Sequence, residues 1–157
     1  ADPDGPAASR ASAILGLELP TTPSTCVSDD TLTVIWMGPD EWLITAGTRS
    51  AATLETRLRA AVGEDGGAAI DVSAQRTTLR LSGPDARDVL AKGCSLDLHP
   101  TVFRTGTAAQ TMLGLSGVVL IALDDAGCDY RILVRSSFAR YLADWLIDAA
   151  EEFGVLR

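Results

Sequence analysis

The sequence predicts an α+β fold in which mainly antiparallel sheets carry helices on their outer side. Apolar and polar residues alternate in several short stretches, turn residues separate neighbouring stretches, and amphipathic segments follow two of the strand pairs. The 157 residues, 46% hydrophobic and 22% charged, suffice for one domain or for two small intertwined halves. Because neither half would bury its apolar faces alone, we expect both to pack as one unit.

The first predicted element pair is a β-hairpin followed by a helix. Residues 31–37 and 41–46 alternate as strands do, and Gly38-Pro39-Asp40 supplies the turn between them. The helix is expected to have Thr48 or Ser50 as its N-cap, Ala51, Leu54, Leu58 and Ala61 on one face, and Gly63 as its stop.

The second part of the chain predicts further strands and two helices. Strands are expected at 68–73 and 76–82, and a short helix runs from Pro84 to Gly93 with Asp85 and Lys92 near its favourable dipole ends. The remaining expected elements are strands at 107–113, 117–123 and 130–134, and a final helix from Ser136 or Ser137 to Phe153.

An internal repeat relates the two strand–helix segments, which indicates a duplication. The matched positions are Glu41, Trp42, Ile44, Ala51, Leu54, Leu58 and Val62 against Asp129, Tyr130, Ile132, Ala139, Leu142, Leu146 and Ala150. Residues 1–12 are small, polar or proline-containing and offer little to bury, so we expect a flexible N-terminal arm there and a single domain at 13–157. Its two intertwined pseudo-repeats would span about 31–93 and 105–154.

Charge and cysteine content exclude several classes of function. A formal net charge of −8 and a pI near 4.5 disfavour nucleic acid and anionic membranes as partners. Three cysteines at irregular spacing fit a reducing compartment. Neither a signal peptide nor an apolar run of roughly 18 residues is evident, so we expect a cytoplasmic protein.

Cys94, Asp97 and His99 are the strongest candidates for chemistry, because they lie close together and His99 is the only histidine. A zinc site needs about four ligands, usually from separated elements, and no second cluster of Cys or His exists. A Cys–His pair needs side chains that converge, which residues of one short loop rarely do. The spacing therefore favours a structural loop or a subunit contact over a metal site or a catalytic pair.

Other motifs remain weak. Neither GxGxxG nor GxxxxGK occurs, so a nucleotide site is not expected. Gly114-Leu-Ser-Gly117 lacks the second glycine of a nucleophile elbow and is interpreted as a turn. Arg76 and Arg80 would share a strand face roughly 13 Å apart, where they could clamp an acidic partner surface or form a solvated basic face. The sequence has three tryptophans, Trp36, Trp42 and Trp145. For these side chains we favour core packing over an interface or an aromatic substrate cage.

Several long phrases of the sequence resemble a known family. These are WMGPDEWLI at 36–44, DVSAQRTTLRLSGPDARDVLAKGCSLDLHP at 71–100, AAQTMLG at 108–114 and YRILVRSSFARYLADWL at 130–146. In this order they resemble the gamma subunit of bacterial heterotetrameric sarcosine oxidase, from about Leu19 to Phe153. More distantly, the DVS and LSGPDA phrases are similar to the aminomethyltransferase of the glycine cleavage system. That similarity implies its duplicated folate-binding-domain fold.

The resemblance implies a subunit of a complex that oxidatively demethylates sarcosine to glycine, with hydrogen peroxide and 5,10-methylenetetrahydrofolate as products. Its partners would be the alpha, beta and delta subunits. FAD, FMN, NAD, zinc and tetrahydrofolate would be held by those subunits, which leaves this chain with no catalytic, cofactor-binding or metal residues.

Two alternatives stay open beside this non-catalytic structural role. One is an autonomous folate-binding, aminomethyltransferase-like protein, and the other is a scaffold module of a different dehydrogenase complex. The transferases are expected to carry an acidic pair in the strand pair that corresponds to residues 117–123. This sequence has Gly-Val-Val-Leu-Ile-Ala-Leu there, which offers no carboxylate to an amine.

Overall fold

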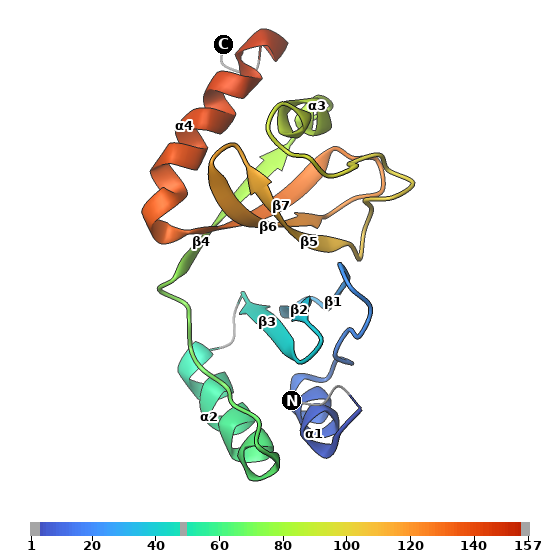
Figure 1. Cartoon of the computed structure of the whole chain (residues 1–157), viewed down its shortest axis with the longest axis vertical. Coiled ribbons are helices and arrows are strands. Elements are labelled where there is room, and N and C mark those ends of the chain that lie inside the picture. The colour runs from blue at the N-terminus through green and yellow to red at the C-terminus, as the bar shows by residue number, and fades with distance from the viewer. Residues whose placement is uncertain (1–3, 48–49, 155–157) are drawn as a thin grey trace. The chain divides into compact units, whose positions relative to one another are not determined.

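The computed structural model describes residues 4–47 and 50–154. The chain divides into two compact units, Ala1–Ser73 and Ala74–Arg157, each with its own antiparallel sheet (Figure 1). The overall class is therefore mixed helix and antiparallel sheet, as the alternation and spacing predict. None of the helices among the described residues combines the length and the apolar character needed to cross a bilayer.

The first unit contains a helix, three strands and a second helix. Its elements are α1 (Pro6–Leu15), β1 (Cys26–Ser28), β2 (Leu32–Gly38), β3 (Glu41–Ala46), α2 (Ala51–Val62) and the 3₁₀ turn η1 (Gly63–Asp65). The sheet order is β1-β2-β3, and all neighbours are antiparallel. The predicted hairpin and helix are confirmed, with Ser50 at the N-cap position. The other candidate N-cap, Thr48, lies outside the described residues.

The N-terminal segment differs from the expected flexible arm of residues 1–12. From Pro6 it forms helix α1, which ends at Gly16 in a left-handed conformation with φ 78°. Ala7 and Ala11 are buried and contribute to the core of this unit together with Leu15. Small residues raise little hydrophobic signal in a sequence, yet alanine is the strongest helix former and allows close packing. Residues 1–3 of the expected arm are not among those described.

The second unit contains a four-stranded sheet with helices α3 and α4. Its elements are β4 (Arg76–Ser82), α3 (Ala86–Ala91), β5 (Ala108–Leu113), β6 (Ser116–Ala122), β7 (Asp129–Arg135), η2 (Ser136–Phe138), α4 (Ala139–Ala150) and η3 (Glu151–Phe153). The sheet order is β4-β7-β6-β5, with every neighbour antiparallel. All five predicted elements from residue 76 to the last strand form within a few residues of the expected bounds.

The predicted strand at 68–73 does not form. Asp71 accepts hydrogen bonds from the backbone N–H of Ser73 at 2.8 Å and from its hydroxyl at 2.5 Å, which closes a local turn. Ile70, which the alternation would bury, is 71% exposed. The apolar–polar alternation therefore does not lead to a strand here, because the Asp71 carboxylate accepts the backbone N–H of Ser73, which a strand would pair with a neighbouring strand.

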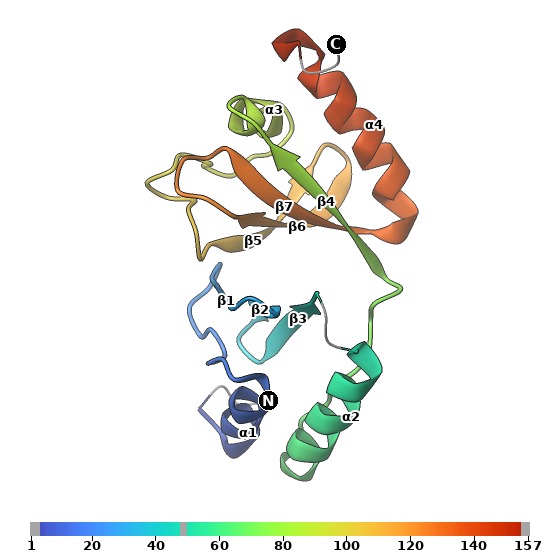
Figure 2. The same ribbon diagram turned by 180° about the vertical axis from the view of Figure 1, so that it is seen from behind.

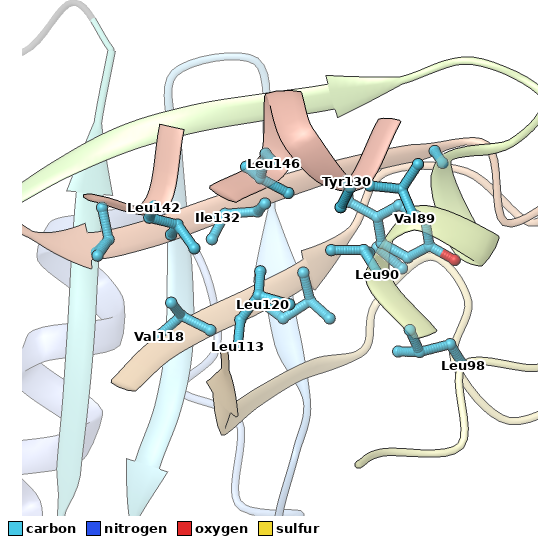
Figure 3. Close-up of a cluster of buried hydrophobic side chains, with 14 of the residues drawn as sticks. Val89, Leu90, Leu98, Leu113, Val118, Leu120, Tyr130, Ile132, Leu142 and Leu146 are labelled. Carbon is cyan, nitrogen blue, oxygen red and sulfur yellow. The ribbon is translucent and has the colours of Figure 1, made fainter. Parts of the chain in front are cut away.

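The core of the second unit lies between one sheet face and the two helices (Figure 3). Leu142 and Leu146 of α4 meet Ile132 of β7 and Leu120 of β6, and Leu90 of α3 closes the other end. All but Leu146 are at most 1% exposed. The predicted apolar stripe of the last helix therefore packs as expected.

Apart from β4, which has no counterpart in the first unit, the two units share one order of elements: a helix, three antiparallel strands in sequential order, and a helix. In the first unit these are α1-β1-β2-β3-α2, and in the second α3-β5-β6-β7-α4. The boundary between units at residues 73 and 74 falls inside the expected first repeat, because β4 pairs with β7. The duplication stays a prediction, but repeats drawn from the element order would begin at α1 and α3, not at residues 31 and 105.

The short helix α3 ends for a different reason from the one predicted. Gly93 does not take a left-handed conformation. A side chain there would meet Trp145, since a Cβ built on Gly93 would lie 2.5 Å from Trp145 Cζ2. Glycine is thus required for the close approach of α4 to the end of α3.

Candidate functional site

The loop that carries Cys94, Asp97 and His99 gives each of these side chains a structural partner. The Asp97 carboxylate accepts the backbone N–H of His99 at 2.9 Å, and His99 Nδ1 lies 2.8 Å from the hydroxyl of Thr101. Cys94 forms an isolated β-bridge with Leu113, and its Sγ lies 3.9 Å from Thr111 Oγ1 on β5. The histidine and the cysteine therefore turn to different partners, and among the described residues the two are not hydrogen-bonded to each other.

A resident metal does not fit this loop. Within residues 4–47 and 50–154, no group of three or more His, Cys, Asp or Glu side chains is placed to hold a metal ion. The Asp97 oxygen that could serve as a ligand is already used to shape the turn before His99. The donor set therefore falls short of the four ligands that a structural zinc site requires.

The Gly114–Gly117 segment forms the turn between β5 and β6, as interpreted from the sequence. Ser116 is 2% exposed, so its hydroxyl is not presented to a substrate. Gly114 has φ 57°, and a Cβ there would lie 2.8 Å from the Tyr141 hydroxyl. That hydroxyl in turn accepts the N–H of Leu115 at 3.0 Å. The turn is held against α4 and does not form a nucleophile elbow.

Two of the three tryptophans pack against the cores of their own units, as expected. Trp42 joins the core of the first unit and donates its indole N–H to the carbonyl of Pro20 at 2.8 Å. Trp145 joins the core of the second unit. Trp36 is half-buried and lies opposite Trp42 in the hairpin. None of these positions resembles an open aromatic cage.

The two arginines predicted to share a strand face have different surroundings. Arg80 binds Asp129 in a bidentate pair, with Nε 2.9 Å from Oδ1 and Nη2 2.5 Å from Oδ2. Asp129 lies at the start of the neighbouring strand β7. Arg76 Nε is buried and makes no hydrogen bond with any described residue. Arg80 is therefore engaged within the chain, while Arg76 is not satisfied there.

The electrostatic consequence of the Arg80 pair is local. Hydrogen bonds from Arg80 lower the pKa of Asp129, and the charges of Arg80 and Arg131 act in the same direction. The same contact raises the pKa of Arg80. Burial raises the pKa of Tyr130, whose hydroxyl has no hydrogen-bond partner among the described residues. Neither effect brings a group's titration close to neutral pH, where a general acid or base would operate.

Sequence reasoning missed a contact that joins the two helices of the second unit. Lys92, after the end of α3, donates to the carbonyl of Ala149, forms an ion pair with Glu152 at 2.6 Å and lies 4.9 Å from the ring centre of Phe153. The sequence predicts for Lys92 only a favourable interaction with the dipole of its own helix. No local signal could have indicated this role, because the partners lie far along the chain.

Large apolar side chains are exposed at one end of the second unit. Leu115 of the β5–β6 turn is 78% exposed and Phe138, just before α4, is 43% exposed. Both contact Tyr141: Leu115 through its N–H, and Phe138 through an edge-on ring contact at 6.5 Å. We call this pair with Tyr141 the aromatic end. Exposed apolar residues gathered in this way are typical of a surface that binds another protein.

The described residues of the first unit also border an open depression beside α1. It is lined by Ser9, Ser12, Ala13, Gly16, Leu17 and Glu18. The Ser9 hydroxyl donates to the carbonyl of Gly5 at 3.4 Å, and Ser12 Oγ accepts the N–H of Leu19 at 3.2 Å. The polar groups are thus engaged locally, and the depression has the open, polar character of a surface groove rather than of a ligand pocket.

Comparison with known proteins gives one consistent family. The sarcosine oxidase gamma subunit family matches residues 1–152. The gamma subunit of sarcosine oxidase from Corynebacterium sp. (strain U-96) is 40% identical over 142 residues, which cover 90% of this chain and 67% of the relative. Those from Corynebacterium sp. (strain P-1) and from an Arthrobacter species are each 42% identical over 120 residues. The match spans only 57% of the length of these last two relatives.

A solved structure agrees. A chain of the heterotetrameric sarcosine oxidase from Corynebacterium sp. U-96, in complex with pyrrole 2-carboxylate, is similar with a TM-score of 0.91 and 35% identity. The similarity covers all of this chain and 79% of that one. With a family match over residues 1–152 and a relative that is 40% identical over 90% of its length, this chain belongs to the sarcosine oxidase gamma subunit family.

Proposed function

We propose that this chain is a non-catalytic structural subunit of a heterotetrameric sarcosine oxidase. The observation that carries the proposal is the loop of the only histidine: Asp97 and His99 bond within the loop, while Cys94 faces β5. A chain that belongs to this family and whose best candidate groups are engaged structurally contributes binding surface rather than chemistry. The exposed aromatic end supplies one such surface.

The proposal extends to partners, cofactors and compartment. The partners are the alpha, beta and delta subunits of the oxidase, and the complex acts in the cytoplasm. The complex converts sarcosine to glycine and yields hydrogen peroxide and 5,10-methylenetetrahydrofolate. FAD, FMN, NAD, zinc and tetrahydrofolate belong to the other subunits of that complex.

The duplicated folate-binding-domain fold is part of the same proposal. Its support is the shared order of elements in the two units and the matched residues of the two strand–helix segments. Leu54, Leu58 and Val62 lie in one core, and their counterparts Leu142, Leu146 and Ala150 lie in the other. An aminomethyl-transferring activity is not proposed, because β6 is apolar and offers no carboxylate.

Co-expression with the other three subunits tests the proposal. A tag on this chain should retain all of them in equal amounts, with flavin absorbance in the purified complex, and the isolated chain should show no sarcosine-dependent peroxide formation. A melting-temperature increase of the isolated chain with tetrahydrofolate would instead favour the autonomous folate-binding protein. Turnover by the isolated chain would overturn the structural role.

Substitution of the only histidine tests the assignment of no catalytic residue. His99→Ala in the assembled complex should leave the rate of peroxide formation within a few-fold of normal, because His99 Nδ1 is engaged with Thr101 inside the loop. Thr101→Val, which removes the same contact from the other side, is the matched control. Loss of turnover in His99→Ala alone, with the complex still intact, would show that the ring takes part in chemistry.

A further inference from the structure

Four arginines lie on one face of the strand pair β4–β7. The antiparallel register places Arg76 opposite Arg135 and Arg80 opposite Arg131. Residues of a strand alternate between faces, so these positions share one face while Leu79 and Leu81 of β4 point to the core on the other. β4 is an edge strand of its sheet, next to β7 (Figure 2). On this face Leu133 is buried, whereas Thr78, Arg80 and Arg135 are exposed. We call the four residues the arginine face.

The positive charge of the arginine face is only partly compensated. Like charges directly opposite one another in neighbouring strands are destabilising. The two strands contain a single carboxylate, Asp129, and its two oxygens are occupied by Arg80. The Arg131 charge also acts on Asp129. The Arg76–Arg135 end therefore has no carboxylate on either strand.

A second observation points to the same end of the face. Arg76 Nε is buried and lacks a hydrogen-bond partner among the described residues. A buried donor on a charged group is costly to leave unsatisfied. The chain as a whole is acidic, with a net charge of −8, yet four of its 13 basic residues gather here. A cluster of positive charge on an otherwise acidic protein favours a role in binding an acidic group.

We propose that the Arg76–Arg135 end of the arginine face docks an aspartate- or glutamate-bearing segment of another subunit of the oxidase. This inference rests on the proposed function. A carboxylate between the two guanidinium groups would accept two charge-assisted hydrogen bonds and remove the repulsion between them. Arg80, already paired with Asp129, holds one side of the face in place. Arg135 is exposed and so can be reached by the segment.

Binding of this chain to a complex of the other three subunits tests the proposal. The double variant Arg76→Ala/Arg135→Ala should bind at least tenfold more weakly than the unmodified chain, and its affinity should depend less on salt. The control is Arg140→Ala on α4, where the side chain is 95% exposed and its ion pair with Asp144 is 3.8 Å long. This control should bind with unchanged affinity and salt dependence.

Stability of the isolated variants separates docking from a structural role. Because the double variant loses a repulsive pair, its urea midpoint should equal or exceed that of the unmodified chain. Weak binding together with a stable fold would support docking. Weak binding that is explained by unfolding would assign the arginines to the fold and overturn the proposal. The single variants should each show part of the loss in affinity.

Three further results would overturn the proposed docking. Unchanged affinity of the double variant would overturn the proposal, and self-association of that variant would then show that the arginines protect the edge strand. A melting-temperature increase with polyglutamyl folate that the double variant abolishes would assign the face to a small ligand and likewise overturn docking. Failure of the unmodified chain itself to bind the other subunits would overturn the proposed function and this inference with it.

Discussion

Apart from β4, the two units have the same order of elements, but their cores are unequal. Among the described residues, the core cluster of the first unit has eight buried members, including the small Ala7 and Ala11. The cluster of the second unit has 17, including the fully buried Tyr130 and Leu142. Since apolar area removed from water is the main stabilising term, the second unit should be the more stable of the two.

In each unit, a basic side chain from the first helix or its end binds the end of the second helix. In the first unit Arg10 of α1 donates to the carbonyl of Ala61 at 2.6 Å and forms an ion pair with Asp65. In the second unit Lys92 binds the carbonyl of Ala149 and the carboxylate of Glu152. Ala61 and Ala149 correspond in the predicted repeat. A cation thus binds the last turn of the second helix at equivalent positions, although the sequences around Arg10 and Lys92 differ.

The largest expected effect compares matched core leucines. Leu142→Ala should cost about 3–5 kcal/mol of unfolding free energy and Leu54→Ala about 2–3 kcal/mol, because truncation leaves a cavity whose cost depends on how rigid its lining is. Leu142 is 0% exposed and Leu54 is 8% exposed. Urea denaturation followed by circular dichroism measures both. An equal or larger loss for Leu54→Ala would contradict the difference between the two cores.

A pair of glycine substitutions gives the next largest effect. Gly93→Ala should cost about 1–3 kcal/mol, because its Cβ would come within 2.5 Å of Trp145 Cζ2 and α4 would have to shift. Gly63 has helical angles, φ −64° and ψ −37°. Nothing lies within 4 Å of an added Cβ there.

Gly63→Ala is therefore the matched control, and it should raise stability by up to about 1 kcal/mol. Thermal unfolding reports both changes, and tryptophan fluorescence should change only in Gly93→Ala. A neutral Gly93→Ala would show that the contact between α3 and α4 is looser than the structure indicates.

Substitution of Lys92 or Arg10, the basic side chains that join the two helices of each unit, should have a smaller effect on stability. Lys92→Met, which keeps most of the side-chain length, should cost about 0.5–1.5 kcal/mol through the lost bonds to Ala149 and Glu152. Arg10→Met should cause a similar loss in the first unit, through the carbonyl of Ala61. Chemical denaturation compares the two variants. A loss in only one of them would argue against equivalent roles in the two units.

The smallest expected effect is the pH dependence of the Arg80–Asp129 pair. Because the pKa of Asp129 is lowered in the folded chain, the pair stabilises the fold above the ordinary aspartate pKa. This contribution is lost as the pH falls below about 4 and through the folded pKa.

Asp129→Asn should therefore be slightly less stable than the unmodified chain at pH 7 and equal to it in strong acid. The difference should be small, since the Arg80 side chain is 66% exposed. Urea midpoints at several pH values measure it. A gap that widens towards acid pH would contradict this sign.

Some features followed from the sequence alone because their causes are local. Alternation and turn residues located the β2–β3 hairpin and the strands from β4 to β7. The apolar stripe of α4 located its buried face. The spacing of Cys94, Asp97 and His99 within one loop favours a structural role, which stays a prediction, and the structure gives each of the three side chains a partner.

Other features required the tertiary structure, because their causes are contacts between distant residues. Helix α1 packs through alanines, which carry little hydrophobic signal in a sequence. A turn at Asp71 forms in place of the predicted strand at 68–73. The pairing of β4 with β7 moved the unit boundary and brought Arg76 opposite Arg135. Periodicity determines which residues face inward, whereas strand pairing and helix packing determine which residues meet, and only the folded chain decides those.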